Sequence, residues 1–225
     1  MDSKRISITV RANTPIEEFN YLKYIIVRLP FYMKHGYQVG LPDIDELKSE
    51  KVLSNENHCF DLFLDKEYQV EFFENGISKA KEMCQIIEES FPKLVKLHDL
   101  WGFKIFNTYQ ILLTKYGPGG SYNEKKGSVI MKTMRDGTFG RNNPEQTIAH
   151  EIIHIGVEEC IIEKFKLNHT EKERLVDLMV KNLYKDVFPN YRIQMLGETN
   201  IDPYVTRDTI STLSTSIEEF TSNRL

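Results

Sequence analysis

The chain is poor in the features that mark secreted proteins. Its 225 residues contain only three cysteines, Cys59, Cys84 and Cys160, which are odd in number and widely spaced. This usage argues against a disulfide framework and against a C-x-x-C zinc site, and it is typical of a reducing compartment. The first ten residues contain no apolar run of the kind found in signal peptides. We therefore expect a cytoplasmic protein.

Long hydrophobic runs and a strong excess of one charge are also lacking. The longest apolar candidate, residues 21–32, is interrupted by Lys23, Arg28 and Pro30, so no segment is expected to span a membrane. The net charge is −4 and no extended run of Lys and Arg occurs, which argues against a nucleic-acid partner. Composition leaves the oligomeric state open.

Histidine is scarce, with 6 residues in the chain, yet two of them form one pattern: residues 150–154 read H-E-x-x-H. On a helix, residues four apart lie one above the other on the same face. His150 and His154 can therefore both offer an imidazole nitrogen to one metal ion. Glu151 lies one step around the helix, beside such a metal, where a general base for a metal-bound water is needed.

The residues around this motif predict a buried helix. Asn143 is a suitable N-cap and Pro144 suits the first helical position. Isoleucines at helical spacing, among them Ile148 and Ile152, indicate a buried stripe. Buried polar groups need partners, and a metal ion is one such partner. The alternative is a core helix whose histidines form hydrogen bonds with neighbouring carbonyl groups.

The H-E-x-x-H motif resembles the zinc-binding and catalytic signature of the zincin metallopeptidases. The metzincin subgroup would require Gly at position 157 and His at position 160, where this chain has Val157 and Cys160. Cys160 would also lie nearly on the opposite side of a continuing helix. The metzincin pattern therefore fails, and a third ligand is expected from another helix.

A second predicted helix begins near residue 170 and runs to about Val187. It carries Glu173 and Asp177 four residues apart on one face. This arrangement resembles the gluzincins, the thermolysin and neprilysin families, in which E-x-x-x-D on a second helix follows H-E-x-x-H. The resemblance covers roughly residues 143–187.

The gluzincin resemblance implies a role for each of these residues. His150, His154 and Glu173 would hold Zn²⁺, Glu151 would be the general base, and Asp177 would orient one zinc-bound histidine, His150.

Gluzincins also use a downstream Tyr or His to stabilise the oxyanion. Tyr191 is the first choice because it follows the second helix, with Tyr184, Tyr204 and His169 as alternatives.

The third ligand has competing interpretations. Thr170 and Glu173 also have the spacing of a capping box, in which Glu173 would only reach back to the cap. Glu158 and Glu171 are further acidic candidates. Glu158, however, follows the two histidines on the same helix, and three ligands from one straight helix make a poor tetrahedron.

The rest of the chain predicts an α+β fold. A zincin-like core is expected to have a β-hairpin or small sheet, formed by segments 103–116 and 128–134, before the H-E-x-x-H helix. Residues 129–134 or 138–141 are candidates for a sheet edge to which an extended substrate adds as a strand. A strand is expected near residues 6–10, a short one at 60–64, and helices over 16–31 and 66–90. Gly117 to Ser121 predicts a turn.

The sequence divides into a mixed N-terminal region (1–100), a metallopeptidase core (101–190) and a C-terminal tail that could form a docking helix (191–225). All three regions could also form one compact domain. The sequence therefore predicts a zinc metallopeptidase acting on a peptide or protein substrate. The alternative is a zincin-fold binding or regulatory protein with a structural or vestigial zinc site, and the presence of Glu151 favours the enzyme.

Overall fold

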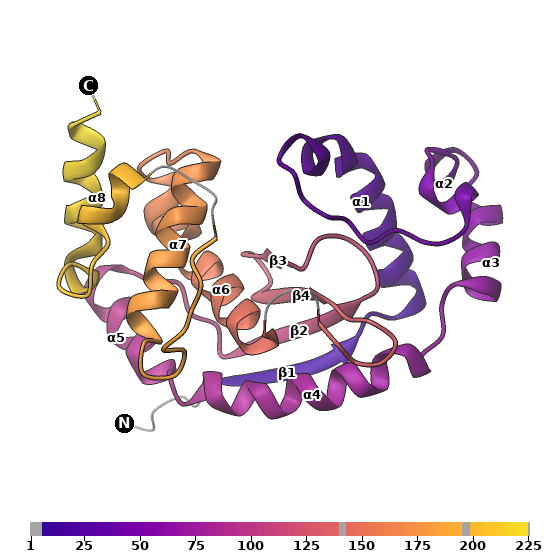
Figure 1. Ribbon diagram of the computed structural model, residues 1–225, viewed down its shortest axis with the longest axis horizontal. Helices are drawn as coiled ribbons and strands as arrows, with labels where there is room; N and C mark the ends of the chain where they lie inside the picture. The colour runs from indigo at the N-terminus through magenta and orange to yellow at the C-terminus, as the bar shows by residue number, and fades with distance from the viewer. Residues whose placement is uncertain (1–5, 140–142, 195–198, 225) are drawn as a thin grey trace.

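The computed structural model describes residues 6–139, 143–194 and 199–224, and it confirms the predicted α+β class (Figure 1). The strands form a 4-stranded sheet. They are β1 (Ser7–Ala12), β2 (Thr108–Thr114), β3 (Gly120–Asn123) and β4 (Ser128–Lys132). The α-helices are α1 (Pro15–Lys34), α2 (Lys51–Ser54), α3 (Glu56–Lys66), α4 (Glu71–Glu88), α5 (Phe91–Trp101), α6 (Pro144–Val157), α7 (His169–Leu183) and α8 (Leu213–Ser222). Shorter segments are η1 (Asp45–Lys48), the π-helical η2 (Glu158–Glu163), η3 (Thr199–Tyr204) and η4 (Ile210–Thr212).

The sheet has the order β1-β2-β4-β3 and is mixed. Strands β1, β2 and β4 run parallel, and β3 alone pairs antiparallel, with β4. The predicted hairpin between segments 103–116 and 128–134 is therefore wrong in direction, because these segments pair in parallel. The actual hairpin joins β4 to β3, whose first residues, Gly120 and Ser121, were assigned to a turn.

The position of the sheet edge also differs from the prediction. β4 is an interior strand, so residues 129–134 do not form the edge; β3 does. Of the second candidate, 138–141, Phe139 forms a single bridge with Thr133, and residues 140 and 141 lie outside the described part of the chain.

The larger hydrophobic core lies between the sheet and helices α4 to α8. Helix α6 begins at Pro144 as predicted and packs against β3, β4, α4 and α7. Its residues from Ile148 to Val157 are all buried, and they include the two histidines and Glu151.

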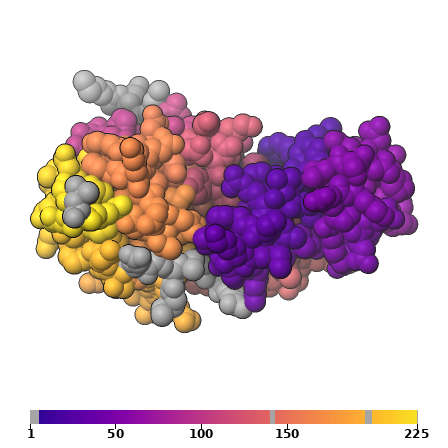
Figure 2. Space-filling model, turned by 90° about the horizontal axis from the view of Figure 1, so that it is seen from above, coloured from indigo at the N-terminus to yellow at the C-terminus, as the bar shows by residue number. Residues whose placement is uncertain are grey.

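A second, smaller core is formed by side chains of α1, α2, α3 and η1. The strand predicted at residues 60–64 is wrong, because these residues lie within α3, where Phe63 is fully buried. The predicted helix at 66–90 corresponds to α4, and Gly76 does not interrupt it. Seen from above, the α1–α3 end and the α7–α8 end of the molecule lie at opposite sides of an elongated shape (Figure 2).

The C-terminal segment docks onto the rest of the chain. Leu213 and Ile217 of α8 are buried in the larger core, and the indole Nε1 of Trp101 donates a hydrogen bond of 2.9 Å to the carbonyl oxygen of Ile210. Helix α8 and the turn before it thus pack against the rest of the chain. The division into regions 1–100, 101–190 and 191–225 stays a prediction, although β1 and β2 join residues from both sides of position 100 in one sheet.

Within residues 6–139, 143–194 and 199–224, no helix combines the length and the apolar character needed to cross a bilayer.

Gly156 provides a test of how tightly α6 is packed. A Cβ atom at this position would lie 1.8 Å from Cζ of Phe103, whose ring is fully buried. Gly156→Ala should therefore lower the free energy of unfolding by about 1–3 kcal/mol through overpacking, in spite of the better helix propensity of alanine. Urea denaturation measures this loss. Adding Phe103→Leu should recover part of it, whereas a Gly156→Ala variant as stable as the wild type would contradict this packing.

Candidate metal centre

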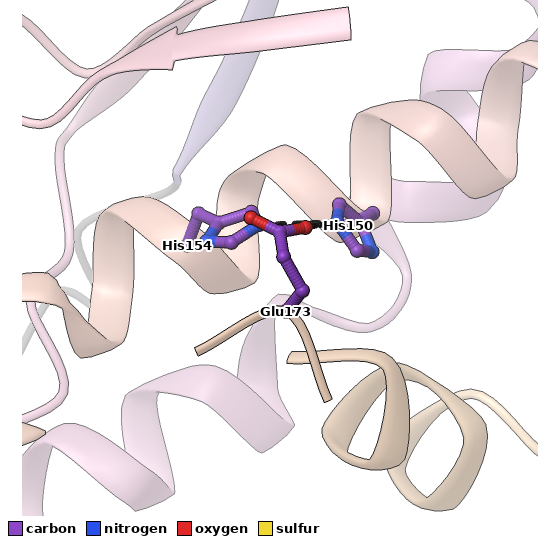
Figure 3. A group of neighbouring side chains, drawn as sticks. All are labelled: His150, His154 and Glu173. Carbon is purple, nitrogen blue, oxygen red and sulfur yellow. Dashed lines mark hydrogen bonds and ion pairs between the residues drawn. The ribbon is translucent and has the colours of Figure 1, made fainter. Parts of the chain in front are cut away.

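Two helices bring the three predicted ligands together. His150 and His154 project from α6, and Glu173 reaches between them from α7 (Figure 3). The Nε2 atoms of the two histidines are 3.0 Å apart. Oε2 of Glu173 lies 3.6 Å from Nε2 of His150 and 3.5 Å from Nε2 of His154. All three residues are buried, and their ligand atoms lie within 4.8 Å of one another, so the group could hold a metal ion.

The start of α7 explains why Glu173 is available to this group. Asn168 is the N-cap: its side chain accepts a hydrogen bond from the backbone N–H of Glu171, and the Glu171 carboxylate accepts one of 2.8 Å from the backbone N–H of Asn168. The capping box therefore uses Asn168 and Glu171 rather than Thr170 and Glu173. The alternative capping role of Glu173 is wrong, and Glu171 is engaged at the cap.

Asp177 lies one turn after Glu173 and contacts the other side of the His150 ring. Its Oδ1 is 3.2 Å from Nδ1 of His150, and its Oδ2 accepts a hydrogen bond of 2.7 Å from the backbone N–H of Gln194. Asp177 is fully buried. The contact fixes the ring orientation in which Nε2 points toward Glu173.

Tyr191 lies on this same side of His150. Its hydroxyl donates a hydrogen bond of 2.6 Å to Oδ1 of Asp177 and is 3.2 Å from Nδ1 of His150. The hydroxyl is thus engaged with the carboxylate behind the histidine, whereas the predicted ligand atoms gather at the Nε2 side. This placement suits a residue that orients Asp177 and His150.

The charges of the group favour a bound cation. Burial works to lower the pKa of His150, but its hydrogen bonds with Asp177 and Glu173 outweigh burial and raise that pKa to about 10. Burial lowers the pKa of His154 to about 4, against the opposing effect of Glu173. With no cation bound, the two carboxylates favour a proton on His150, and a metal ion would replace that proton, because histidine binds metals as the neutral imidazole.

The pKa values of the two glutamates near the histidines, Glu151 and Glu173, are shifted in opposite directions. Burial raises the pKa of Glu173, but His154 and His150 outweigh burial and hold it well below its usual range. Burial, assisted by the Glu173 carboxylate, raises the pKa of Glu151 to about 7, although His150 acts against the shift. A carboxyl group with such a pKa can both accept and return a proton near neutral pH.

Strand β3 passes directly over Glu151. A Cβ atom on Gly120 would lie 2.5 Å from Oε1 of Glu151 and 2.7 Å from Cγ2 of Thr147. Only glycine allows the strand to approach the carboxylate this closely. Among residues 6–139, 143–194 and 199–224, no side chain or backbone group forms a hydrogen bond or ion pair with the Glu151 carboxylate.

The donor set fits zinc. Two imidazole nitrogens and one carboxylate oxygen form a His₂Glu set, which is typical of catalytic zinc sites and leaves a fourth position for water. The other candidates are engaged elsewhere. Glu158 accepts a hydrogen bond from the hydroxyl of Tyr122, and the Cys160 thiol donates to the carbonyl oxygen of Gly156.

His150, His154 and Glu173 lie in a cleft of about 1080 Å³. One wall is α1, which contributes several aromatic side chains; the others are β3, α6, the start of α7 and residues 190–194. The walls meet where the hydroxyl of Tyr37 lies 3.2 Å from Nε2 of His169 and where the ring of Phe31 contacts that of His169 at 5.7 Å. Figure 2 shows the end of α1 beside α7 at this place.

Two parts of the site, the cleft wall formed by α1 and the tyrosine of β3, were not identified from the sequence. The cleft wall formed by α1 is distant in sequence from the motif, and Tyr122 of β3 stacks on His154 with a centroid distance of 4.7 Å. Gly120 and Tyr122 could have been noticed only by reading the Gly-rich segment after residue 117 as a strand.

A scan against protein-family models, a search of curated proteins and a search of solved structures each found no match.

Glu173 and Glu171 form a matched pair for testing the metal centre. Glu173→Gln removes a ligand and should weaken zinc binding by more than about 100-fold, beyond the effect of losing a residue that only orients a ligand. Glu171→Gln keeps an amide that can serve the cap, so its zinc affinity should equal that of the wild type. Competition with a chromogenic chelator measures both. Equal affinity of the two variants would exclude Glu173 as a ligand.

Proposed function

We propose that the protein is a zinc-dependent metallopeptidase that hydrolyses peptide bonds. The observation that supports this most is the juxtaposition of His150, His154 and Glu173 with the uncommitted carboxylate of Glu151 inside one cleft. A purely structural zinc site needs no such carboxylate, so this placement favours an enzyme over a binding protein with a vestigial site.

When bound by His150, His154 and Glu173, zinc would act as a Lewis acid that polarises a carbonyl group and lowers the pKa of a water molecule toward roughly 7. The chain's own contribution is proton transfer. Glu151 accepts the proton of the attacking water and returns it to the leaving amine, as a general base and then a general acid. Asp177 and Tyr191 keep His150 in its orientation throughout.

The oxyanion formed in this reaction needs a further hydrogen-bond donor. The hydroxyl of Tyr191 is held by Asp177, Tyr184 is buried in the larger core, and Tyr204 packs on Phe220 of α8. His169 and Tyr191 both line the cleft, and the His169 ring has Nδ1 3.8 Å from Oε1 of Glu173 and Nε2 3.2 Å from the hydroxyl of Tyr37. We propose His169 as the donor ahead of Tyr191, because the Tyr191 hydroxyl already donates its hydrogen to Asp177.

The free edge of the sheet suits an extended peptide substrate. The backbone N–H of Lys132 donates a hydrogen bond of 3.0 Å to the carbonyl oxygen of Gly119, so the backbone polar groups of Gly119 face β4. Because orientation alternates along an antiparallel strand, the backbone groups of Gly120 and Tyr122 face the open side. A peptide could add there as a strand, directly above Glu151.

Glu151→Gln tests the proposed chemistry. The variant should bind zinc as the wild type does, because Glu151 is not a ligand, but its turnover of a fluorogenic peptide library should fall by about 10²–10⁴-fold. His154→Ala, which loses a ligand, should fail to retain zinc. Undiminished peptide hydrolysis by the Glu151→Gln variant would rule out this mechanism and return the binding-protein alternative to first place.

His169→Ala tests the proposed oxyanion donor. We expect kcat for peptide hydrolysis to fall by about 100-fold while zinc affinity is unchanged, because only the transition state loses a hydrogen bond. His58→Ala is the matched control, since its side chain is exposed on α3. An unchanged kcat in the His169→Ala variant would remove this role.

A further inference from the structure

The two histidines of the metal centre are held in different ways. His150 has Asp177 and Tyr191 at its Nδ1 atom. Nδ1 of His154 is buried and has no hydrogen-bond partner within the described residues. Histidines that bind metals usually have a partner at the second ring nitrogen, and that partner fixes the orientation of the ring. The orientation of His154 must therefore depend on another contact.

The ring of Tyr122 supplies a close contact with His154. The two rings lie nearly parallel, at an interplanar angle of 9° and a centroid distance of 4.7 Å. Offset stacking of this kind restricts rotation of the imidazole about its bond to Cβ, because any turn of the ring would drive it into the tyrosine. His154 is 2% exposed, so no alternative space is open to it.

Tyr122 is itself fixed to both helices that carry the predicted ligands. Its hydroxyl donates a hydrogen bond of 2.6 Å to Glu158, in the π-helical turn that follows α6, and accepts one of 3.0 Å from Nζ of Lys172. Lys172 directly precedes Glu173 on α7. Nζ of Lys172 also lies 3.8 Å from Oε1 of Glu158, which completes the group around the hydroxyl.

We propose that Tyr122 is a positioning residue for the metal centre: its ring, stacked on His154, does for that histidine what Asp177 does for His150. This inference rests on the proposed zinc site. It adds that the edge strand β3 is mechanically coupled to the metal, because the residue whose backbone faces the open edge also holds a ligand.

Variants at Tyr122 separate the contribution of its ring from that of its hydroxyl, and the measured quantity is the Kd for Zn²⁺. Tyr122→Leu and Tyr122→Met remove the stacking but retain an apolar side chain, and each should raise the zinc Kd by about 10–100-fold, as loss of a ligand's supporting residue does. Tyr122→Phe keeps the ring and should stay within about threefold of the wild type. Tyr109→Leu is the matched control, since Tyr109 is a fully buried tyrosine of strand β2, which β4 separates from β3 in the same sheet.

The control distinguishes positioning from general loss of stability. Urea denaturation should show that Tyr109→Leu is destabilised while its zinc Kd is unchanged. Absorption of Co²⁺ bound in place of zinc should change in Tyr122→Leu and Tyr122→Met but be restored in Tyr122→Phe. A wild-type Kd in either folded non-aromatic variant would overturn the positioning role and leave the zinc site intact. A wild type that binds no zinc would overturn both proposals.

Discussion

Two carboxylates, Glu173 and Asp177, are buried four residues apart on α7 against the two imidazoles of α6. Burying a charge costs several kcal/mol unless it is paired, so the packing of α6 on α7 depends on the imidazoles that face these acids. Removing His150 would take one partner from each carboxylate, leaving Glu173 beside His154 and Asp177 with the Tyr191 hydroxyl and the Gln194 N–H. The candidate metal centre is thus part of the core, and if zinc binds there, loss of a ligand should affect stability together with zinc affinity.

The sheet and the N-terminal helices complete the centre from outside. β3 brings Gly120 against Glu151 and Tyr122 against His154, while α1 forms the facing wall of the cleft. Parallel pairing of β1, β2 and β4 leaves β3 as the free antiparallel edge. The motif supplies the reactive side chains, and elements from elsewhere in the chain supply the enclosure that a peptide would enter.

The sequence predicts the elements whose signals are local. Helical spacing places His150 and His154 on one face of a helix and Glu173 and Asp177 on one face of another, because each pair is set by one turn of helix. That the two faces meet is implied by the gluzincin resemblance and not by the spacing. Contacts between distant segments could not be predicted in this way. The residues of segment 128–134 indicate a strand but neither its partner nor its direction, so the predicted hairpin with segment 103–116 is wrong. Asn168 and Thr170 each begin a possible capping box, and only the structure distinguishes them.

X-ray absorption spectroscopy of the zinc-loaded protein tests the central claim most directly. The account predicts one zinc ion surrounded by nitrogen and oxygen only, with the multiple-scattering signature of two imidazoles, at distances of about 2.0–2.2 Å. A sulfur shell near 2.3 Å would instead assign zinc to a cysteine, and the absence of imidazole scattering or of retained zinc after dialysis would contradict the account.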